Sequence, residues 1–116
     1  MRDDKKNLIV DLTFEFALKV IDYSQKLTQL RKYDMASQIF RSGTSIGANI
    51  REAQNAESKK DFIHKFKIAA KEADELEYWL LLCEKSEHYP TPQGMSGNIE
   101  SIIKIISKII SSSKSS

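Results

Sequence analysis

Basic side chains recur at helical spacing near the middle of the chain. Four of them lie four, three and four positions apart, on one side of a helix: Lys60, His64, Lys67 and Lys71. Such a row can follow a phosphate backbone, because each neutralised phosphate releases counterions and strengthens binding. Lys59 and Arg51 extend the predicted nucleic-acid-binding set. The alternative is an ordinary solvated face, which the acidic Asp74 and Glu75 at the end of the row favour.

A second constellation is polar rather than basic and lies one helix earlier. Its members are Arg41, Ser45, Asn49 and Glu52. Arg41 and Glu52 are about three helical turns apart, so each needs a partner on another helix or another subunit. Buried polar groups must be hydrogen-bonded, so the set is either a specific polar interface, a ligand groove, or a means of fixing helix packing. We favour packing and assembly over a ligand site.

The remaining reactive residues do not form a catalytic pattern. A di-iron bundle needs Glu-x-x-His on two helices, whereas this chain offers Asp61-x-x-His64 alone. Cys83 is the one cysteine and has no histidine at ligand spacing, so it is predicted to be a buried or interface thiol rather than a nucleophile. There is no glycine-rich phosphate loop. The sequence therefore predicts no enzymatic activity, no cofactor and no metal.

Composition limits the class of protein. The chain has 116 residues, 41% hydrophobic and 29% charged, which fits one soluble domain. Its net charge of +2 is too small to demand a polyanionic partner. The first seven residues lack the apolar core of a secretory signal, and no apolar run approaches the roughly 18 to 20 residues that span a bilayer. We expect a cytoplasmic protein with no membrane association.

Four helices must position these side chains, because apolar residues recur at steps of three and four along most of the chain. The predicted helices cover about 7–29, 35–55, 59–87 and 98–111, followed by a polar tail at 112–116. Asp34 is the predicted N-cap of the second helix, and Ser58 with Asp61 form a capping box before the third. The pattern predicts an all-α, antiparallel up-down-up-down four-helix bundle forming a single domain over 1–116.

Two of these helices carry more apolar residues than one core can use. The first helix has an inner line that runs from Ile9 to Leu30, and a second line rotated by more than about 90° from it. The third helix also has apolar residues away from its phenylalanine stripe. These lines, with the polar constellation, predict a homo-oligomer interface made of Val10, Phe14, Leu18, Ile21, Arg41, Ser45, Ala48, Asn49, Glu52, Ile68, Trp79 and Leu82. The alternative is a bundle that wraps its helices deeply or leaves single hydrophobes in water.

The second and third helices resemble a known family. The residues that carry the resemblance are Arg41-Ser42, Ser45-Ile46, Ala48-Asn49-Ile50 with Glu52, then Asp61-Phe62, Ile68-Ala69, Glu75-Leu76 and Leu80. They are similar to the four-helix bundle proteins encoded by intervening sequences of bacterial 23S ribosomal RNA genes. More distantly, the bundle resembles the accessory variability determinant of diversity-generating retroelements. The chain departs from the family pattern at Ala53, where glycine is common, and at Lys71-Glu72, where a Gly-Ser pair is frequent.

The resemblance implies a bacterial, cytoplasmic homo-oligomer, a pentamer, with no established enzymatic activity. Together with the lysine row it favours a non-catalytic module that associates with RNA, ribosomal particles or a nucleic-acid enzyme. The apolar lines keep a second hypothesis open, in which the chain is a protein-only adaptor or scaffold that binds another protein and no nucleic acid.

Overall fold

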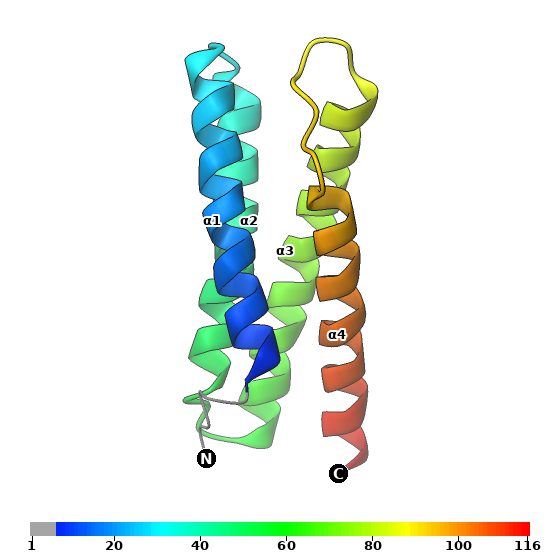
Figure 1. Cartoon of the computed structure of the whole chain (residues 1–116). Coiled ribbons are helices and arrows are strands. Elements are labelled where there is room, and N and C mark those ends of the chain that lie inside the picture. The colour runs from blue at the N-terminus through cyan, green and yellow to red at the C-terminus, as the bar shows by residue number, and fades with distance from the viewer. Residues whose placement is uncertain (1–6) are drawn as a thin grey trace.

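The computed structural model describes residues 7–116 as four antiparallel helices in an elongated bundle (Figure 1). The helices are α1 (Leu8–Gln29), α2 (Tyr33–Ala53), α3 (Lys59–Lys85) and α4 (Met95–Ser115). Each packs on the next in the chain, and α4 returns to α1, within a body of 46 × 21 × 20 Å. The predicted all-α up-down-up-down bundle is confirmed. Residues 1–6, which belong to the stretch interpreted as lacking a secretory signal, lie outside the described residues.

One apolar face of every helix meets at the centre. The fully buried residues recur at helical spacing and include Val20 and Leu27 of α1, Ile39, Ile46 and Ile50 of α2, Phe66, Leu76 and Leu80 of α3, and Ile99 and Ile106 of α4. Burying such side chains contributes roughly 1.5–3 kcal/mol each, so this core holds the four helices in place. Within residues 7–116, none of the helices combines the length and apolarity that a bilayer crossing demands.

Helices α1 and α2 approach each other closely because α2 carries glycine on the side that faces α1. A Cβ atom added to Gly43 would lie 2.6 Å and 2.7 Å from the two methyl carbons of Val20. A Cβ added to Gly47 would lie 3.4 Å from the backbone oxygen of Thr13. The glycines that weaken α2 as an isolated helix therefore allow it to pack tightly on α1.

The predicted N-cap of α2, Asp34, is wrong. α2 begins at Tyr33, with Lys32 as N-cap and no side-chain cap, so Asp34 lies inside the first turn. α1 ends in a Schellman motif, in which Arg31 adopts a left-handed conformation at φ 62° and the Lys32 N–H donates to the Leu27 carbonyl at 2.8 Å. This tight reversal starts α2 two residues early, where the Asp34 carboxylate still favours the positive end of the helix dipole.

The ends of α3 and α4 also differ from prediction. Ser58 caps α3 by accepting from the Asp61 N–H at 3.0 Å, as the capping box predicts, but α3 ends at Lys85 rather than 87. α4 begins at Met95 rather than 98, because Met95 is buried on the apolar face that the isoleucines continue. It also runs on to Ser115, so the segment 112–116 predicted as a tail is almost entirely helical and stays beside the start of α3.

The burial of two residues of α1 differs from the prediction. Val10, assigned to the outer apolar line, is buried, and it lies beside Gly47 of α2 where the two helices pack. Leu30, the last member of the predicted inner line, is exposed, since it is the C-cap and lies beyond the final turn of α1. The other outer residues of α1, Phe14, Leu18 and Ile21, are exposed as predicted.

Alanine substitution should have opposite effects on stability at Gly43, which lies close to Val20, and at Gly97, which has open space around it. Gly43→Ala should lower the free energy of unfolding by about 1–3 kcal/mol, because the new methyl overlaps the stiff, fully buried Val20. Gly97→Ala, where nothing lies within 4 Å, should raise it by about 0.5–1 kcal/mol through helix propensity. Urea unfolding followed by circular dichroism measures both. In a Val20→Ala background the loss at Gly43 should disappear, and a loss that persists there would contradict the steric explanation.

Candidate nucleic-acid interface

The predicted lysine row lines a cleft between the start of α3 and the end of α4. The cleft has a volume of about 560 Å³ and is lined by Lys59, Lys60, Ile63, His64, Lys67 and Lys114. No acidic residue is among them. Four of the five predicted residues on α3 therefore lie together, and α4 adds a fifth basic group. We refer to these six residues as the basic cleft.

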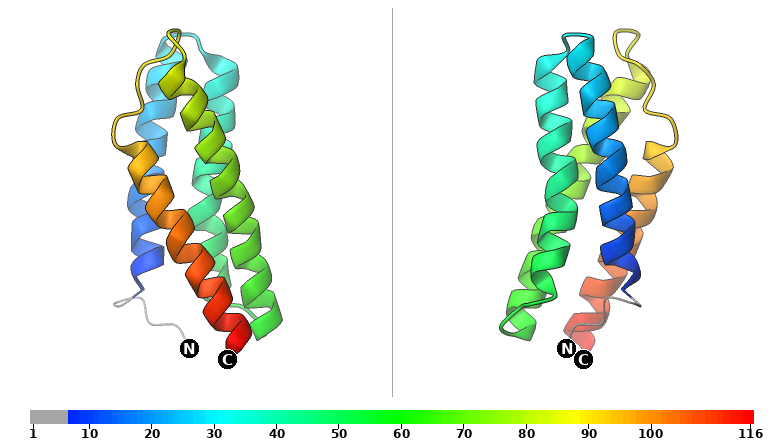
Figure 2. Two further views of the ribbon diagram at one scale, coloured as in Figure 1. Left: turned by 90° about the vertical axis from the view of Figure 1, so that its right-hand side faces the viewer. Right: turned by 60° about the vertical axis from the view of Figure 1, so that its left-hand side comes forward.

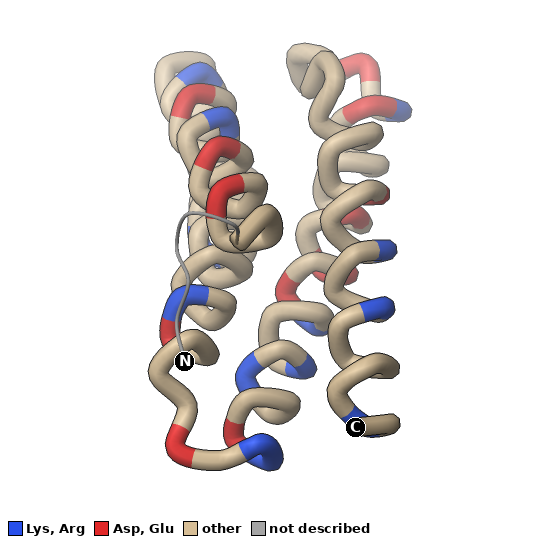
Figure 3. The backbone as a smooth tube through the Cα atoms, turned by 60° about the horizontal axis from the view of Figure 1, so that its bottom comes forward, with Lys and Arg blue, Asp and Glu red and all other residues tan. Residues whose placement is uncertain are grey.

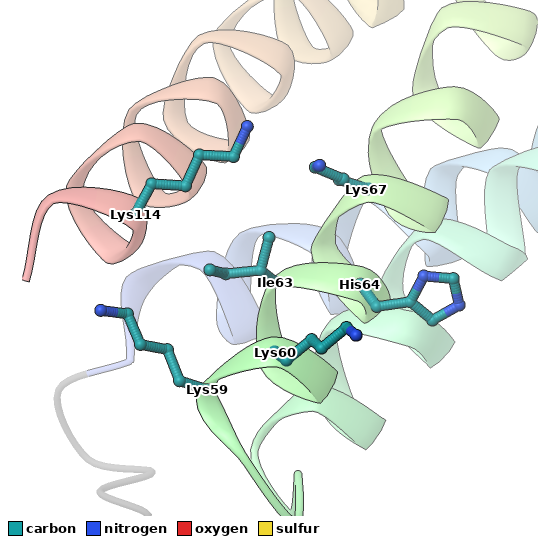
Figure 4. Close-up of a pocket in the computed structure, with 6 residues that line it drawn as sticks. All are labelled: Lys59, Lys60, Ile63, His64, Lys67 and Lys114. Carbon is teal, nitrogen blue, oxygen red and sulfur yellow. The ribbon is translucent and has the colours of Figure 1, made fainter.

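The side chains of the basic cleft point in two directions (Figure 4). Lys59 and Lys67 of α3 and Lys114 of α4 surround the apolar Ile63, whereas Lys60 and His64 extend away from α4. Lys59 also donates a hydrogen bond to the backbone oxygen of Ser116, which links the two helix ends. The cleft thus presents an apolar floor with positive groups on both sides and a continuation onto the outer surface of α3.

Two members of the predicted set lie elsewhere. Lys71 is exposed one turn beyond Lys67 and does not line the cleft, so it extends the surface but not the hollow. Arg51 lines a separate hollow between α1 and α2, beside Phe14 and Ala48, and is therefore not part of the basic cleft. The reason is helical phase, since the side of α2 that carries Arg51 packs along α1 rather than along α3.

Most basic positions of α3 lie in its first half and most acidic positions in its second half, with Asp61 in the first turn as an exception (Figure 3). Basic positions recur over the first half of the helix and along α4. Asp74 is exposed and ends the row, as expected. Glu75 does not, because its carboxylate accepts hydrogen bonds from Arg41 and from Trp79 Nε1, the latter at 3.1 Å, between α2 and α3. The positive potential of the first half of α3 is therefore less diluted than the sequence alone indicates.

The polar constellation of α2 has its charged partners on α3 of the same chain. Arg41 pairs with Glu72, at 3.2 Å, and with Glu75. Glu52 accepts from Lys65 Nζ at 2.9 Å, and this contact raises the pKa of Lys65. A second subunit is not needed to pair either charge. Glu72, one of the positions at which the chain departs from the family pattern, accepts a hydrogen bond from Arg41 Nη1 across the contact between α2 and α3.

The smaller members of that constellation bond within α2. Ser45 Oγ donates to the Arg41 carbonyl at 2.6 Å, and Asn49 Nδ2 donates to the Ser45 carbonyl at 2.9 Å. Both side chains are partly buried, whereas Ala48 is exposed on the side of α2 that faces α1. None of the described contacts makes these residues a ligand site.

The predicted interface residues of α3 are only partly exposed. Ile68 and Trp79 are half-buried, and Leu82 is 36% exposed. Two neighbours that the sequence analysis did not select are more exposed, Tyr78 at 56% and Leu81 at 48%. The most exposed apolar residues of α3, Tyr78 and Leu81, therefore each come one position before a residue that the pattern selected, Trp79 and Leu82.

Cys83 is buried, which confirms its predicted environment. Burial raises the pKa of its thiol, and burial also raises the pKa of the neighbouring Tyr23, whose hydroxyl donates to the Pro90 carbonyl at 2.5 Å. A protonated, inaccessible thiol is a poor nucleophile. Among residues 7–116, no three His, Cys, Asp or Glu side chains come together as a group that could hold a metal.

Lys114 and Ile63 are the cleft residues that sequence reasoning missed. Lys114 was assigned to a polar tail, because the other four residues of the segment 112–116 are serines and serine is a weak helix former. Its spacings of ten residues from Lys104 and six from Lys108 are not same-side helical spacings, so the sequence carries no periodic signal for it. Ile63 lies four residues from both Lys59 and Lys67, and in the sequence it is a single hydrophobe outside the phenylalanine stripe.

Comparisons with known proteins identify a family and similar solved structures. Residues 5–112 match the family described as 23S rRNA-intervening sequence protein. A crystal structure of a protein with unknown function from the S23 ribosomal protein family of Bacteroides thetaiotaomicron is similar, with 42% identity and a TM-score of 0.84, over 89% of this chain and 98% of that one. None of the curated proteins matches the sequence significantly.

The Arg41 cluster predicts a salt-dependent contribution to stability. Arg41→Gln should lower the free energy of unfolding by about 0.5–1 kcal/mol at 50 mM NaCl, because it breaks a network that spans α2 and α3. At 1 M NaCl, where the Debye length is about 3 Å, the loss should shrink. Lys104→Gln is the control, since its pair with Glu100 is mostly exposed. An equal loss at both salt concentrations in urea unfolding would instead assign the effect to packing of the Arg41 stem.

Proposed function

The chain belongs to the 23S rRNA-intervening sequence protein family, and on that premise we propose that it is a non-catalytic, homo-oligomeric bundle that binds RNA through its basic cleft. The RNA is free or part of a ribosomal particle or of a nucleic-acid enzyme. The single observation that supports this most strongly is the composition of the cleft, which combines four lysines and a histidine from two helix ends with no acidic residue.

The cleft suits a phosphate backbone better than a small metabolite. Its lysine side chains are flexible point charges, which attract phosphates without demanding one fixed geometry. Lys60, Lys67 and Lys71 continue the positive surface along α3, so successive phosphates can be neutralised. Ile63 offers an apolar surface against which a ribose or a base can lie. Such contacts give affinity and little sequence specificity.

Self-association strengthens this proposal. One cleft makes few phosphate contacts, so a single copy should bind weakly at physiological salt. An oligomer repeats the cleft, and linked weak sites gain affinity through their effective concentration. The pentamer that the family resemblance implies would present five such clefts.

Charge reversal tests the binding surface. In Lys60→Glu/Lys67→Glu, affinity for single-stranded RNA should fall at least about tenfold, and the slope of log K against log salt should fall by about one to two. The matched control is Lys104→Glu/Lys108→Glu, which makes the same change of charge on the exposed side of α4 outside the cleft. The measurement is fluorescence anisotropy over a salt series, with light scattering to show that the oligomer is unchanged.

Two outcomes would contradict the proposal, each for a different reason. Equal losses in both variants would mean that net charge, and not the basic cleft, attracts RNA. No binding by the unchanged protein at low salt would overturn the nucleic-acid proposal. In that case a specific protein that co-purifies without nucleic acid would favour the adaptor function, for which the exposed apolar residues of α1 and α3 provide a surface.

A further inference from the structure

The core holds the two sides of the basic cleft unequally. On α3, Phe66 lies among the cleft residues in sequence and is buried, so this side is anchored in the bundle. On α4, the last buried residue is Ile106, about two turns before Lys114. Residues 111–116, which we call the α4 end, are exposed or half-buried. Because tertiary packing supplies most of a helix's stability, the α4 end gains little from the core (Figure 2, left view).

The composition of the α4 end also disfavours a helix. Five of its six residues are serines, whose hydroxyl groups compete for backbone hydrogen bonds and make serine a weaker helix former than alanine. Ser115 Oγ, for example, donates to the Ser111 carbonyl at 3.1 Å. Lys114 is the one residue of the α4 end that lines the cleft. The serines therefore affect the stability of this segment without contacting anything bound in the cleft.

Like charges oppose the arrangement that closes the cleft. Lys114 shares the cleft with Lys59 and Lys67, and positive groups that face one another repel, most strongly at low ionic strength (Figure 4). Of the ion pairs formed among residues 7–116, none uses a lysine of the cleft. The attraction that links the two helix ends is an exposed hydrogen bond from Lys59 to the Ser116 backbone oxygen. Such a bond adds little net stability in water.

From these opposing contributions we propose that the α4 end is a movable side of the basic cleft, and that the phosphate groups of a bound polyanion hold it in the helical arrangement. Without a ligand, the α4 end unfolds and refolds locally. A phosphate between Lys114 and the lysines of α3 replaces repulsion with attraction on both sides, so it binds the helical arrangement more tightly. The inference rests on the proposed function in taking RNA as the polyanion, and it adds that binding is coupled to local folding.

Coupling of this kind lowers affinity by a predictable factor. A ligand that binds the helical arrangement alone loses affinity in proportion to the fraction of molecules in which the α4 end is unfolded. A substitution that stabilises the helix without contacting the ligand should therefore tighten binding. The exposed serines of the α4 end provide such substitutions, because they lie outside the cleft.

The first test replaces two of these serines in the full chain. Ser111→Ala/Ser112→Ala should bind single-stranded RNA about two- to threefold more tightly at low salt, because alanine favours the helical arrangement. Ser101→Ala/Ser107→Ala is the matched control, since both serines are exposed on the part of α4 that the core anchors. Its affinity should be unchanged in the same fluorescence anisotropy titration. Unchanged affinity in the first variant, or equal tightening in both, would overturn the coupling.

Hydrogen–deuterium exchange measures the α4 end directly. In the wild-type chain, saturating single-stranded RNA or inorganic polyphosphate should slow amide exchange over residues 111–116 by about threefold or more. In the free protein, raising NaCl from about 50 mM to about 1 M should also slow it, because salt screens the repulsion. Lys114→Gln should reduce this salt effect, whereas Lys108→Gln, at an exposed residue outside the cleft, should keep it.

The outcomes separate this inference from the proposed function. RNA binding without slower exchange would overturn the coupling and leave the proposed function standing. No RNA binding, with exchange slowed by polyphosphate, would overturn the proposed function and support the coupling to another polyanion. Exchange that neither probe slows would overturn the inference whatever the RNA affinity. An equal salt effect in Lys114→Gln and in the wild-type chain would overturn the role of repulsion inside the cleft.

Discussion

The close packing of α2 on α1 is the contact on which the rest of this bundle depends. Gly43 lies so near Val20 that no side chain fits between them, and Gly47 lies beside the Thr13 backbone. A helix with this many weak formers is stable because its partner covers it, since tertiary packing and not propensity supplies most helix stability in proteins. The contact also sets the rotation of α2 about its own axis. With one side held against α1, the neighbouring sides are assigned to α3 and to the exterior.

That rotation explains how the charges of α2 are distributed. Arg41 and Glu52 point toward α3, where Glu72, Glu75 and Lys65 pair with them. Near its start, α2 instead contributes Tyr33, Ala36, Ser37 and Phe40 to a hollow between α1 and α2 that no charged residue lines. One helix thus contributes an intramolecular ion network on one side and an unpartnered apolar surface on another. The two have different physical consequences, because exposed ion pairs contribute little to stability while apolar surface in water favours association.

The basic cleft depends on the other end of the molecule and on helix length. α4 remains helical through its serine-rich segment, so Lys114 comes to lie beside the first turns of α3. If α4 stopped at residue 111, as its composition indicates, the lysines of α3 would form a flat row rather than one wall of a cleft. Positive groups on two walls act on the same ligand from both sides, which raises the local potential above that of a single solvated helix face.

The sequence alone determined the fold class, the four helices and the family resemblance, because each helix carries its own row of apolar residues at three- and four-residue steps, and such a row is a local property of the chain. Phe16, Ile46, Phe66 and Ile99 each belong to one of these rows. It also identified Lys60, His64 and Lys67 as one basic side of a helix. Only the tertiary structure decided which side of each helix meets which neighbour. It moved Arg51 away from the cleft, buried Val10, paired Arg41 within the chain and added Lys114. These outcomes depend on contacts between residues far apart in sequence. Periodicity within one helix indicates which side faces the core, but not which neighbouring helix each flank meets.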